Sequence, residues 1–255
     1  MVAATALRKP IREIGGFFAL SLDMLVALLN KPFAIREFLE QSWFVARVSL
    51  VPSITLTIPF NAFVVFILNV LLFEIGAADA SGTGAALAVI TQTGPFTTVL
   101  VVGGAAATAI CADLGARTVR EEIDAMRVMG IDPAQRLLVP RVMALTVNAL
   151  LLNGVVCFVG LAGTYAFAVY VNNVNPGSFA ASLTLITGLP DTVISFVKAT
   201  LFGMTAGLVA CYKGITVGGG PQGVGNAVNE TVVYTFLVLI VINTLVTTIG
   251  TTVTK

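Results

Sequence analysis

GGAAATAICADLGARTVREEIDAMRVMGIDPAQRLLVPR, residues 103–141, is the stretch that decides the fold. It begins with small and apolar residues, becomes rich in charge from Asp113 to Arg141, and stops where a new apolar run begins. Charge-free runs flank the charged part, from Ala80 to Ala112 and from Val142 to about Val171. Each run exceeds the roughly 20 residues that a helix needs to cross a bilayer. The stretch therefore predicts two membrane-spanning helices joined by a segment that lies in water.

The composition of the whole chain agrees with a membrane protein. Of the 255 residues, 57% are hydrophobic and 11% are charged, and the mean hydropathy is +0.97. These values lie far from those of a soluble globular domain. A net charge of +1 leaves no basic stripe that could neutralise phosphates, which excludes a nucleic-acid partner. We expect an all-α integral membrane protein with about five transmembrane helices.

The charge-free runs locate these helices within a single domain, residues 1–255. We expect spans at residues 48–73, 84–112, 142–171, 192–212 and 231–254. Pro52 and Pro59 can kink the first span, and Gly94-Pro95 should bend the second, because proline removes a helical hydrogen bond. The region between 178 and 198 leaves its boundary open, because its apolar run is short and is interrupted by Asp191 and Lys198.

The first forty residues predict amphipathic helices on the membrane surface, over residues 11–40. Apolar residues recur there at steps of three and four and so share one helical face. They are Ile11, Ile14, Phe18, Leu22, Leu25 and Leu29. Asn30-Lys31-Pro32 breaks this pattern, and a second stretch leads to Trp43, a residue typical of the interface. Charges interrupt the apolar stretch, so we expect no removable signal peptide.

The orientation follows from the lysines and arginines outside the spans, because basic residues are retained in the cytoplasm. Six lie in the segment up to Arg47, five lie in residues 113–141, and Lys213 follows the fourth span. The loops around Glu74 and Asn172 have none. We therefore expect a cytoplasmic N-terminus, a cytoplasmic 113–141 segment and, after five crossings, an extracytoplasmic C-terminus in the cytoplasmic membrane.

The 113–141 segment predicts a short amphipathic helix. Arg117 with Glu121, and Arg120 with Asp124, are spaced as i,i+4 ion pairs. Gly130 suits the left-handed position that ends a helix, and Asp132-Pro133 supplies an N-cap and a first-turn proline for the next one. The segment is either a solvated connector or a docking element for a cytoplasmic partner. The candidate docking residues are Arg117, Arg120, Glu121, Glu122, Asp124, Gly130, Asp132 and Pro133.

Enzymatic and metal chemistry find little support. The chain has no histidine, which excludes the usual zinc sites and histidine-activated nucleophiles. Its three cysteines each lie alone in an apolar run and are interpreted as small core residues. The glycine-rich run 218–225 is interpreted as a turn, because no Gly-Lys-Ser/Thr follows it. We expect no catalytic residues, no metal and no cofactor.

Lys198 is unusual, because an ionisable group inside a span is costly and usually faces a cavity or an opposite charge. Asp191 is close enough in sequence to be that charge. The alternative is that the lysine side chain extends to the interface.

The chain resembles the MlaE-like permeases, also called YrbE proteins, of the MCE lipid transport systems. The resemblance rests mainly on residues 103–141, with a small-residue helix end, an acidic residue before glycine, a glutamate on the connecting helix and a D-P followed by P-R. These positions are Asp113, Gly115, Glu121, Asp132, Pro133, Pro140 and Arg141. Further matches lie at Lys31-Pro32, Gly94-Pro95, Val197–Gly207 and Asn229–Val233, so the resemblance spans nearly the whole chain. In detail the chain is most similar to the actinobacterial A-type YrbE subunit.

The resemblance implies the permease subunit of an ATP-binding-cassette transporter that moves lipids or fatty acids. It also implies a pair of cytoplasmic ATPase subunits docked on the 113–141 segment, a B-type YrbE paralogue as the second permease subunit, and extracytoplasmic MCE proteins. ATP hydrolysis would belong to the ATPase subunits, and this chain would catalyse nothing.

The resemblance places the substrate path near Thr91, Gln92, Gly94 and Pro95. Many relatives have an Arg-Glu pair before this Gly-Pro, and a Gly-Arg where this chain has Gly104-Ala105. Both departures make the path more neutral, which suits a substrate held mainly by its acyl chains.

Two other classes of function are weaker. A secondary transporter driven by an ion gradient usually has embedded charges and matching halves, and this chain has few such charges and no evident repeat. An intramembrane lipid-modifying enzyme would need clustered carboxylates or histidine within the spans.

Overall fold

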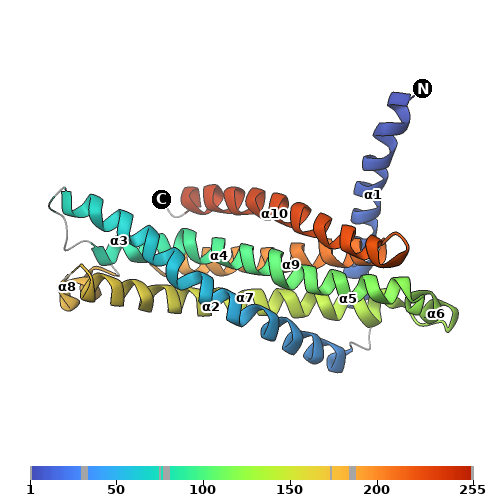
Figure 1. The fold of residues 1–255 in the computed structure, drawn as a ribbon, viewed down its shortest axis with the longest axis horizontal. Helices are drawn as coiled ribbons and strands as arrows, with labels where there is room; N and C mark the ends of the chain where they lie inside the picture. The colour runs from blue at the N-terminus through green and yellow to red at the C-terminus, as the bar shows by residue number, and fades with distance from the viewer. Residues whose placement is uncertain are drawn as a thin grey trace.

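The structure, a computed structural model, describes residues 2–29, 34–74, 76, 81–172, 174–183 and 188–253. Figure 1 shows these residues as an elongated bundle whose long helices run along one axis. Five helical segments within it are long and apolar enough to cross a membrane: Ile35–Leu72, Gly82–Val119, Ala134–Tyr170, Leu189–Ile215 and Gly220–Gly250. The all-α fold and the number of spans are therefore confirmed.

The helices in chain order are α1 (Val2–Leu29), α2 (Ile35–Glu74), α3 (Ser81–Leu87), α4 (Gly94–Val101), α5 (Ala107–Val119), α6 (Glu122–Val128), α7 (Val139–Tyr170), α8 (Pro176–Ser182), α9 (Leu189–Ile215) and α10 (Gly220–Val253). Within the described ranges, three π-helical turns lie between these helices: η2 (Ala88–Thr93), η3 (Val102–Ala106) and η4 (Ala134–Leu138). The second span is thus built from α3, η2, α4, η3 and α5. Its first π turn ends directly before Gly94-Pro95, where the sequence predicts a bend.

The two ends of the bundle differ. α1, α6, η4 and the turn between α9 and α10 gather at one end, which we call the charged end (Figure 1). α3, α8 and the last turns of α10 lie at the other, which we call the opposite end. The described ends of the chain, in α1 and α10, therefore belong to different ends of the bundle, as five crossings require.

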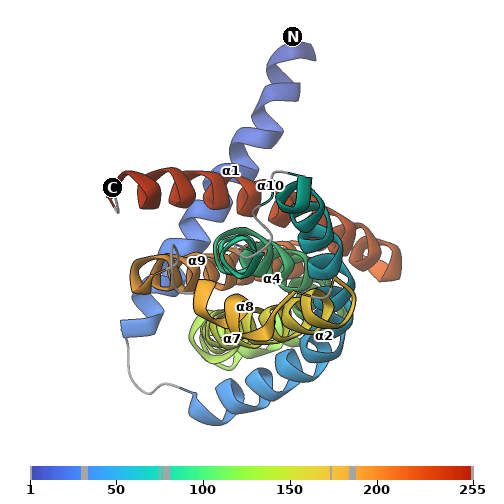
Figure 2. The same ribbon diagram turned by 90° about the vertical axis from the view of Figure 1, so that its left-hand side faces the viewer.

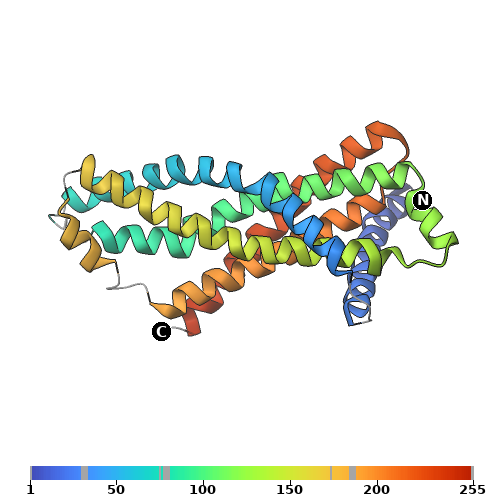
Figure 3. The same ribbon diagram turned by 90° about the horizontal axis from the view of Figure 1, so that it is seen from below.

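α1 runs across the bundle axis at the charged end, in the direction of a helix that lies along a membrane surface (Figures 1 and 3). Its apolar residues Ile14, Phe18, Leu22 and Leu25 are each more than half exposed. Met24 and Ala27 on another side are buried against the bundle. The helix is thus anchored by one side and leaves an apolar face free for lipid.

The start of α2 differs from the sequence-based expectation. Surface helices are predicted over 11–40, but residues 35–40 form the first turns of α2, which continues into the first span. No glycine or proline interrupts this stretch before Pro52, and Arg36 pairs with Glu40 at 2.9 Å. Such i,i+4 pairs stabilise an exposed turn. Residues 30–33, which include the predicted break, and 184–187, in the open boundary region, lie outside the described residues.

The core lies where α5, α7 and α9 meet. Figure 2, seen along the bundle, places α4 near the middle, with α2, α7, α9 and α10 around it. Ile110, Leu114, Leu145 and Phe202 are fully buried in the main apolar cluster. The backbones of α7 and α9 approach so closely that a Cβ on Gly203 would lie 2.6 Å from the Cα of Thr146. Small residues at such contacts allow membrane helices to pack tightly.

α2 turns a polar stripe toward the interior rather than an apolar one. Residues four apart on its buried face are Val45, Ser49, Ser53, Thr57, Asn61, Val65 and Asn69, each at most 2% exposed. The Thr57 hydroxyl donates to the Ser53 carbonyl, and the Asn61 amide donates to the Thr57 carbonyl at 2.9 Å. In hydrocarbon such groups face the protein, where partners are available. The stripe therefore fixes which face of α2 packs inward.

Candidate functional site

A buried arginine organises the charged end. Arg141, in the first turn of α7, has a fully buried side chain. Its Nη2 lies 2.6 Å from Asp113 Oδ2 on α5, and its Nη1 lies 3.3 Å from Glu37 Oε1 on α2. Nη1 also donates to the Leu137 carbonyl at 3.0 Å. Because a buried charge is costly unless it is paired, this contact holds α2, α5 and α7 together at the start of the bundle.

A chain of ion pairs continues from this arginine to α6. Asp113 also pairs with Arg117, whose Nε lies 3.3 Å from Asp113 Oδ2. Glu122, the first residue of α6, lies 3.8 Å from Arg117 Nη1 and 3.1 Å from Arg120 Nε. The 113–141 segment is thus connected to the bundle by consecutive charged contacts, although its outer members are half exposed and individually weak.

The predicted i,i+4 pairs were wrong. Arg117 does not pair with Glu121, nor Arg120 with Asp124, because α5 ends at Val119 and Glu121 takes a left-handed conformation with φ 59°. The break changes the spacing, so that Glu122 receives both arginines. Asp124 pairs with Arg127 instead, at 2.9 Å.

The predicted caps of this segment are confirmed. Gly130 has φ +75°, and the Ile131 N–H donates to the Met126 carbonyl at 2.9 Å, which closes α6 as a left-handed glycine does. The Asp132 carboxylate accepts the Ala134 N–H at 2.9 Å, and Pro133 directly precedes η4. The turn between the two helices is therefore well defined.

The tip of this turn carries exposed apolar side chains, which were not among the docking residues predicted from the sequence. Val128 is 89% exposed, Met129 66% and Ile131 42%. We call these three residues the apolar tip. It comprises the last residue of α6 and the turn that follows, and α6 lies at the far edge of the charged end (Figure 1). Large apolar side chains exposed beside charged ones typically mark a protein contact. The available signal was the pattern V-M-G-I inside a charged segment.

A second charged cluster attaches α1. Lys213 Nζ on α9 lies 2.7 Å from Glu230 Oε2 on α10 and 3.4 Å from Glu13 Oε2 on α1. The same ammonium lies 4.5 Å from the centre of the Tyr234 ring. Phe17 of α1 packs edge-on against Tyr212. These contacts join the surface helix to the ends of α9 and α10.

A polar line crosses the interior of the bundle. Asn61 on α2 accepts a hydrogen bond from Thr93 at the end of η2. Thr98 on α4 donates to Asn153 on α7 at 3.4 Å, and the Asn153 amide donates to Ser195 on α9 at 3.0 Å. The side chains of four spans are thereby linked by hydrogen bonds at a depth where water is scarce.

Lys198 compensates for a proline. Its Nζ donates to the Thr91 carbonyl at 3.1 Å, and the residue is 1% exposed. Pro95 has no N–H, so it cannot make the i,i+4 helical bond that this carbonyl would otherwise accept. The lysine is buried and bonds to protein instead of extending to the interface. Asp191 is not its partner, because its carboxylate accepts the Gly188 N–H at 3.0 Å and caps α9.

The four residues of the predicted substrate path lie together at η2 and the start of α4. Thr91 is half-buried and its hydroxyl donates to the Leu87 carbonyl at 2.6 Å, Gln92 is exposed, and Gly94 and Pro95 are buried. The structure brings them close to the polar line and to Lys198. Their role in a substrate path stays a prediction.

The comparisons with known proteins agree with this architecture. Residues 38–249 match the model of the family described as Permease MlaE. The chain belongs to the MlaE permease family.

Three relatives illustrate the range of the family to which this permease belongs. A probable ABC transporter permease protein of Rickettsia typhi is 29% identical over 94% of this chain and 92% of its own. The intermembrane phospholipid transport system permease protein MlaE of Haemophilus influenzae is 26% identical over 71% of this chain and 69% of its own. The chloroplastic protein TRIGALACTOSYLDIACYLGLYCEROL 1 of Arabidopsis thaliana is 34% identical over 63% of this chain and 46% of its own.

Replacing Arg141 by methionine tests the buried ion pairs of the permease. We expect the free energy of unfolding to fall by about 2–4 kcal/mol, somewhat less than for a fully buried pair, because Glu37 and Asp113 keep some contact with water. This change is measured from thermal unfolding in detergent, with labelling of the three cysteine thiols as the signal of unfolding. Arg36→Met is the matched control, since its pair with Glu40 is exposed and should be worth less than about 1 kcal/mol. Equal losses in both variants would contradict the central role of Arg141.

A double-mutant cycle tests the link between Lys198 and Pro95. Pro95→Ala restores a backbone donor near the Thr91 carbonyl, so Lys198→Met should be tolerated better in that background. We expect a coupling free energy of at least about 1 kcal/mol, measured from the unfolding of the four proteins. The control cycle uses Pro52→Ala, a proline of α2, and should be additive within about 0.5 kcal/mol. Additivity in both cycles would remove the compensating role of Lys198.

Proposed function

We propose that this chain is the membrane-spanning subunit of an ATP-driven lipid transporter, docked through the 113–141 segment on a cytoplasmic ATPase. The single observation that carries the proposal is the apolar tip, which is exposed at the charged end. It follows α6, whose first residue, Glu122, begins a series of ion pairs that reaches α2, α5 and α7. The names of the relatives support the transporter class and, for the Haemophilus influenzae protein, a phospholipid cargo. In this proposal the chain itself catalyses nothing.

The proposed docking surface has two parts with different roles. The apolar tip enters the ATPase, because apolar residues at the centre of a contact supply most of its affinity. The surrounding charged and capping residues fix its direction and select the partner. They are Arg117, Arg120, Glu121, Glu122, Asp124, Gly130, Asp132 and Pro133. Among them, Arg117, Arg120 and Glu122 serve to fix the direction of the tip, because Glu122 already pairs with both arginines.

Further partners follow from the resemblance of the sequence to A-type YrbE subunits. The second permease subunit is proposed to be a B-type paralogue, and extracytoplasmic MCE proteins are proposed to exchange lipid with the pair. The cargo is a lipid or fatty acid that passes near Thr91, Gln92, Gly94 and Pro95. The hydroxyls of Thr91 and Thr97, which bond to backbone carbonyls of their own span, leave few polar groups free there and suit a substrate held by its chains.

An aspartate at the tip tests the docking. In the variant with Val128→Asp and Met129→Asp, two carboxylates would enter an apolar contact, so we expect ATPase co-purification to fall at least about tenfold. Lipid-stimulated ATP hydrolysis should fall with it, while the amount in the membrane should not change. Tyr170→Asp, at the opposite end and 80% exposed in the parent chain, is the matched control. Wild-type co-purification of the tip variant, or transport in liposomes with an ion gradient alone, would overturn the proposal in favour of a secondary transporter.

The proposed orientation places the charged end in the cytoplasm, and single cysteines test it. Cys111 and Cys211 are buried, and the half-buried Cys157 is replaced by alanine to keep the background of labelling low. With a membrane-impermeant maleimide, Tyr170→Cys should react in intact cells and Val128→Cys only after permeabilisation. The reverse pattern would show that the basic residues do not set the orientation as we propose.

A further inference from the structure

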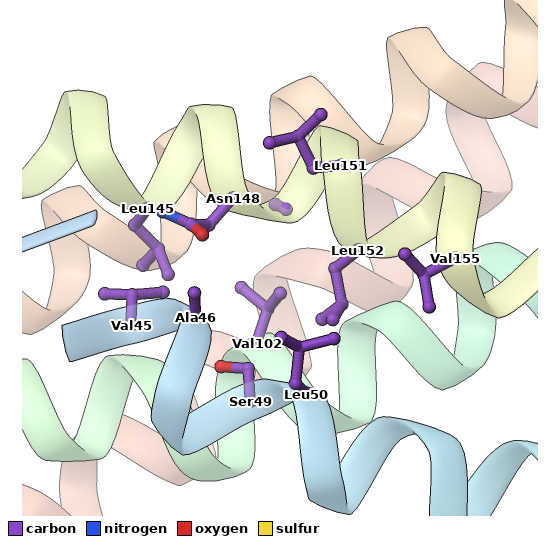
Figure 4. Close-up of a pocket in the computed structure, with 11 residues that line it drawn as sticks. Val45, Ala46, Ser49, Leu50, Val102, Leu145, Asn148, Leu151, Leu152 and Val155 are labelled. Carbon is purple, nitrogen blue, oxygen red and sulfur yellow. The ribbon is translucent and has the colours of Figure 1, made fainter. Parts of the chain in front are cut away.

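A cavity of about 150 Å³ lies between α2 and α7, with Val102 of η3 also lining it (Figure 4). It is formed by the first third of α2 and the first half of α7, so it belongs to the charged-end half of the bundle. Thr91, Gln92, Gly94 and Pro95 do not line it. It is therefore separate from the proposed substrate path.

Two polar side chains face this otherwise apolar cavity, Ser49 from α2 and Asn148 from α7 (Figure 4). The Ser49 hydroxyl is buried and has no hydrogen-bond partner among the described residues, and the residue is 2% exposed. The next two hydroxyls of the same stripe differ, because Ser53 donates to the Leu50 carbonyl and Thr57 to the Ser53 carbonyl. A buried hydroxyl without a partner is costly, so an acceptor that reached the Ser49 hydroxyl from the cavity would stabilise it.

The depth of Ser49 indicates the kind of acceptor. Trp43, 73% exposed, marks the interface on α2. Ser49 follows six residues later, and at 1.5 Å per residue it lies about 9 Å deeper along the helix. The interfacial layer of a bilayer leaflet is roughly 5–8 Å thick. The hydroxyl is thus at the top of the hydrocarbon core, where the ester groups of a glycerolipid join its chains.

The remaining lining indicates which part of the ligand lies beyond the acceptor. Leu50 and Leu151 are exposed at the edge of the cavity, 39% and 59%, and so face the bilayer. Apart from Ser49 and Asn148 the lining is apolar, and a space of about this volume holds a benzene-sized hydrocarbon. The first methylenes of a chain entering from the side fit this description.

We propose that the cavity between α2 and α7 binds an ester-linked acyl chain of a membrane lipid, whose ester carbonyl accepts the hydrogen bond of Ser49. The lipid comes from the leaflet at the charged end. The Asn148 amide nitrogen donates to the Ala144 carbonyl at 2.8 Å, within α7. The bound chain fills the contact between the two helices that Arg141 joins through Glu37, and it is distinct from transported cargo.

Photolabelling of the intact permease complex in phosphatidylcholine nanodiscs tests the site. The probe is a phosphatidylcholine with a diazirine close to the carbonyl end of one chain. We expect labelled peptides from residues 45–50 and 145–155 in clear excess over residues 233–249 of α10, whose apolar side chains are exposed in this chain and serve as the internal reference. Equal labelling of the three regions would mean random contact with lipid and would overturn the proposal.

Three variants and a second probe sharpen the result. Ala46→Phe fills the cavity and should reduce its labelling at least fivefold relative to α10. Ser49→Ala should reduce labelling about three- to tenfold, the value of one hydrogen bond. Ser53→Ala should not, because the Ser53 hydroxyl bonds within α2.

An ether-linked probe, which lacks the carbonyl, should label less than the ester, and Ser49→Ala should abolish that difference. If the ester and ether probes label the wild type equally, Ser49 does not bind the ester carbonyl. Crosslinks from this site to a helix of a partner protein would show that the occupant is not a lipid. Loss of the ATPase leaves these results unchanged, so the two proposals fail separately.

Discussion

The arrangement of this permease depends on the burial of one guanidinium group. Arg141 has no contact with solvent and reaches Asp113 and Glu37, which come from two other helices. A charge in that position is tolerable only when both carboxylates are in place. α2, α5 and α7 must therefore meet in one register at the charged end. The rest of α2 then follows, because its polar stripe can turn inward only in that register.

A second feature lies in the interior of the bundle, where the backbone of the second span departs from a regular α-helix. α4 lies between the π turns η2 and η3, and Pro95 removes one of its helical donors. Lys198 supplies a partner for the Thr91 carbonyl, and the Thr93 side chain, just before the break, bonds to Asn61 of α2. A break in a membrane helix is tolerated where other helices satisfy the freed groups. The irregular span is thus a property of the whole bundle.

What the sequence could predict was local. The number of spans, the left-handed Gly130 and the Asp132 cap depend on neighbouring residues, and all appear in the structure. The ion pairs of the 113–141 segment could not be predicted from spacing, because the left-handed Glu121 ends one helix and begins another. The pairing of Arg141 with Glu37 was equally hidden, since it joins residues far apart in the chain. The partner of Lys198 is a backbone carbonyl. Every residue has one, so this contact could not be predicted from the residue types.

The two features together indicate how the parts of the permease can move. α6 is linked through Glu122, Arg117 and Asp113 to Arg141, so a force on the apolar tip reaches α2, α5 and α7 as one unit. None of the ion pairs among the described residues includes α4, which lies between two π turns in contact with hydroxyls and a lysine. π turns inside helices are often found at functional sites. Docking at the proposed surface would therefore act on the ion-paired helices together, and the predicted substrate path lies next to them, at η2 and the start of α4.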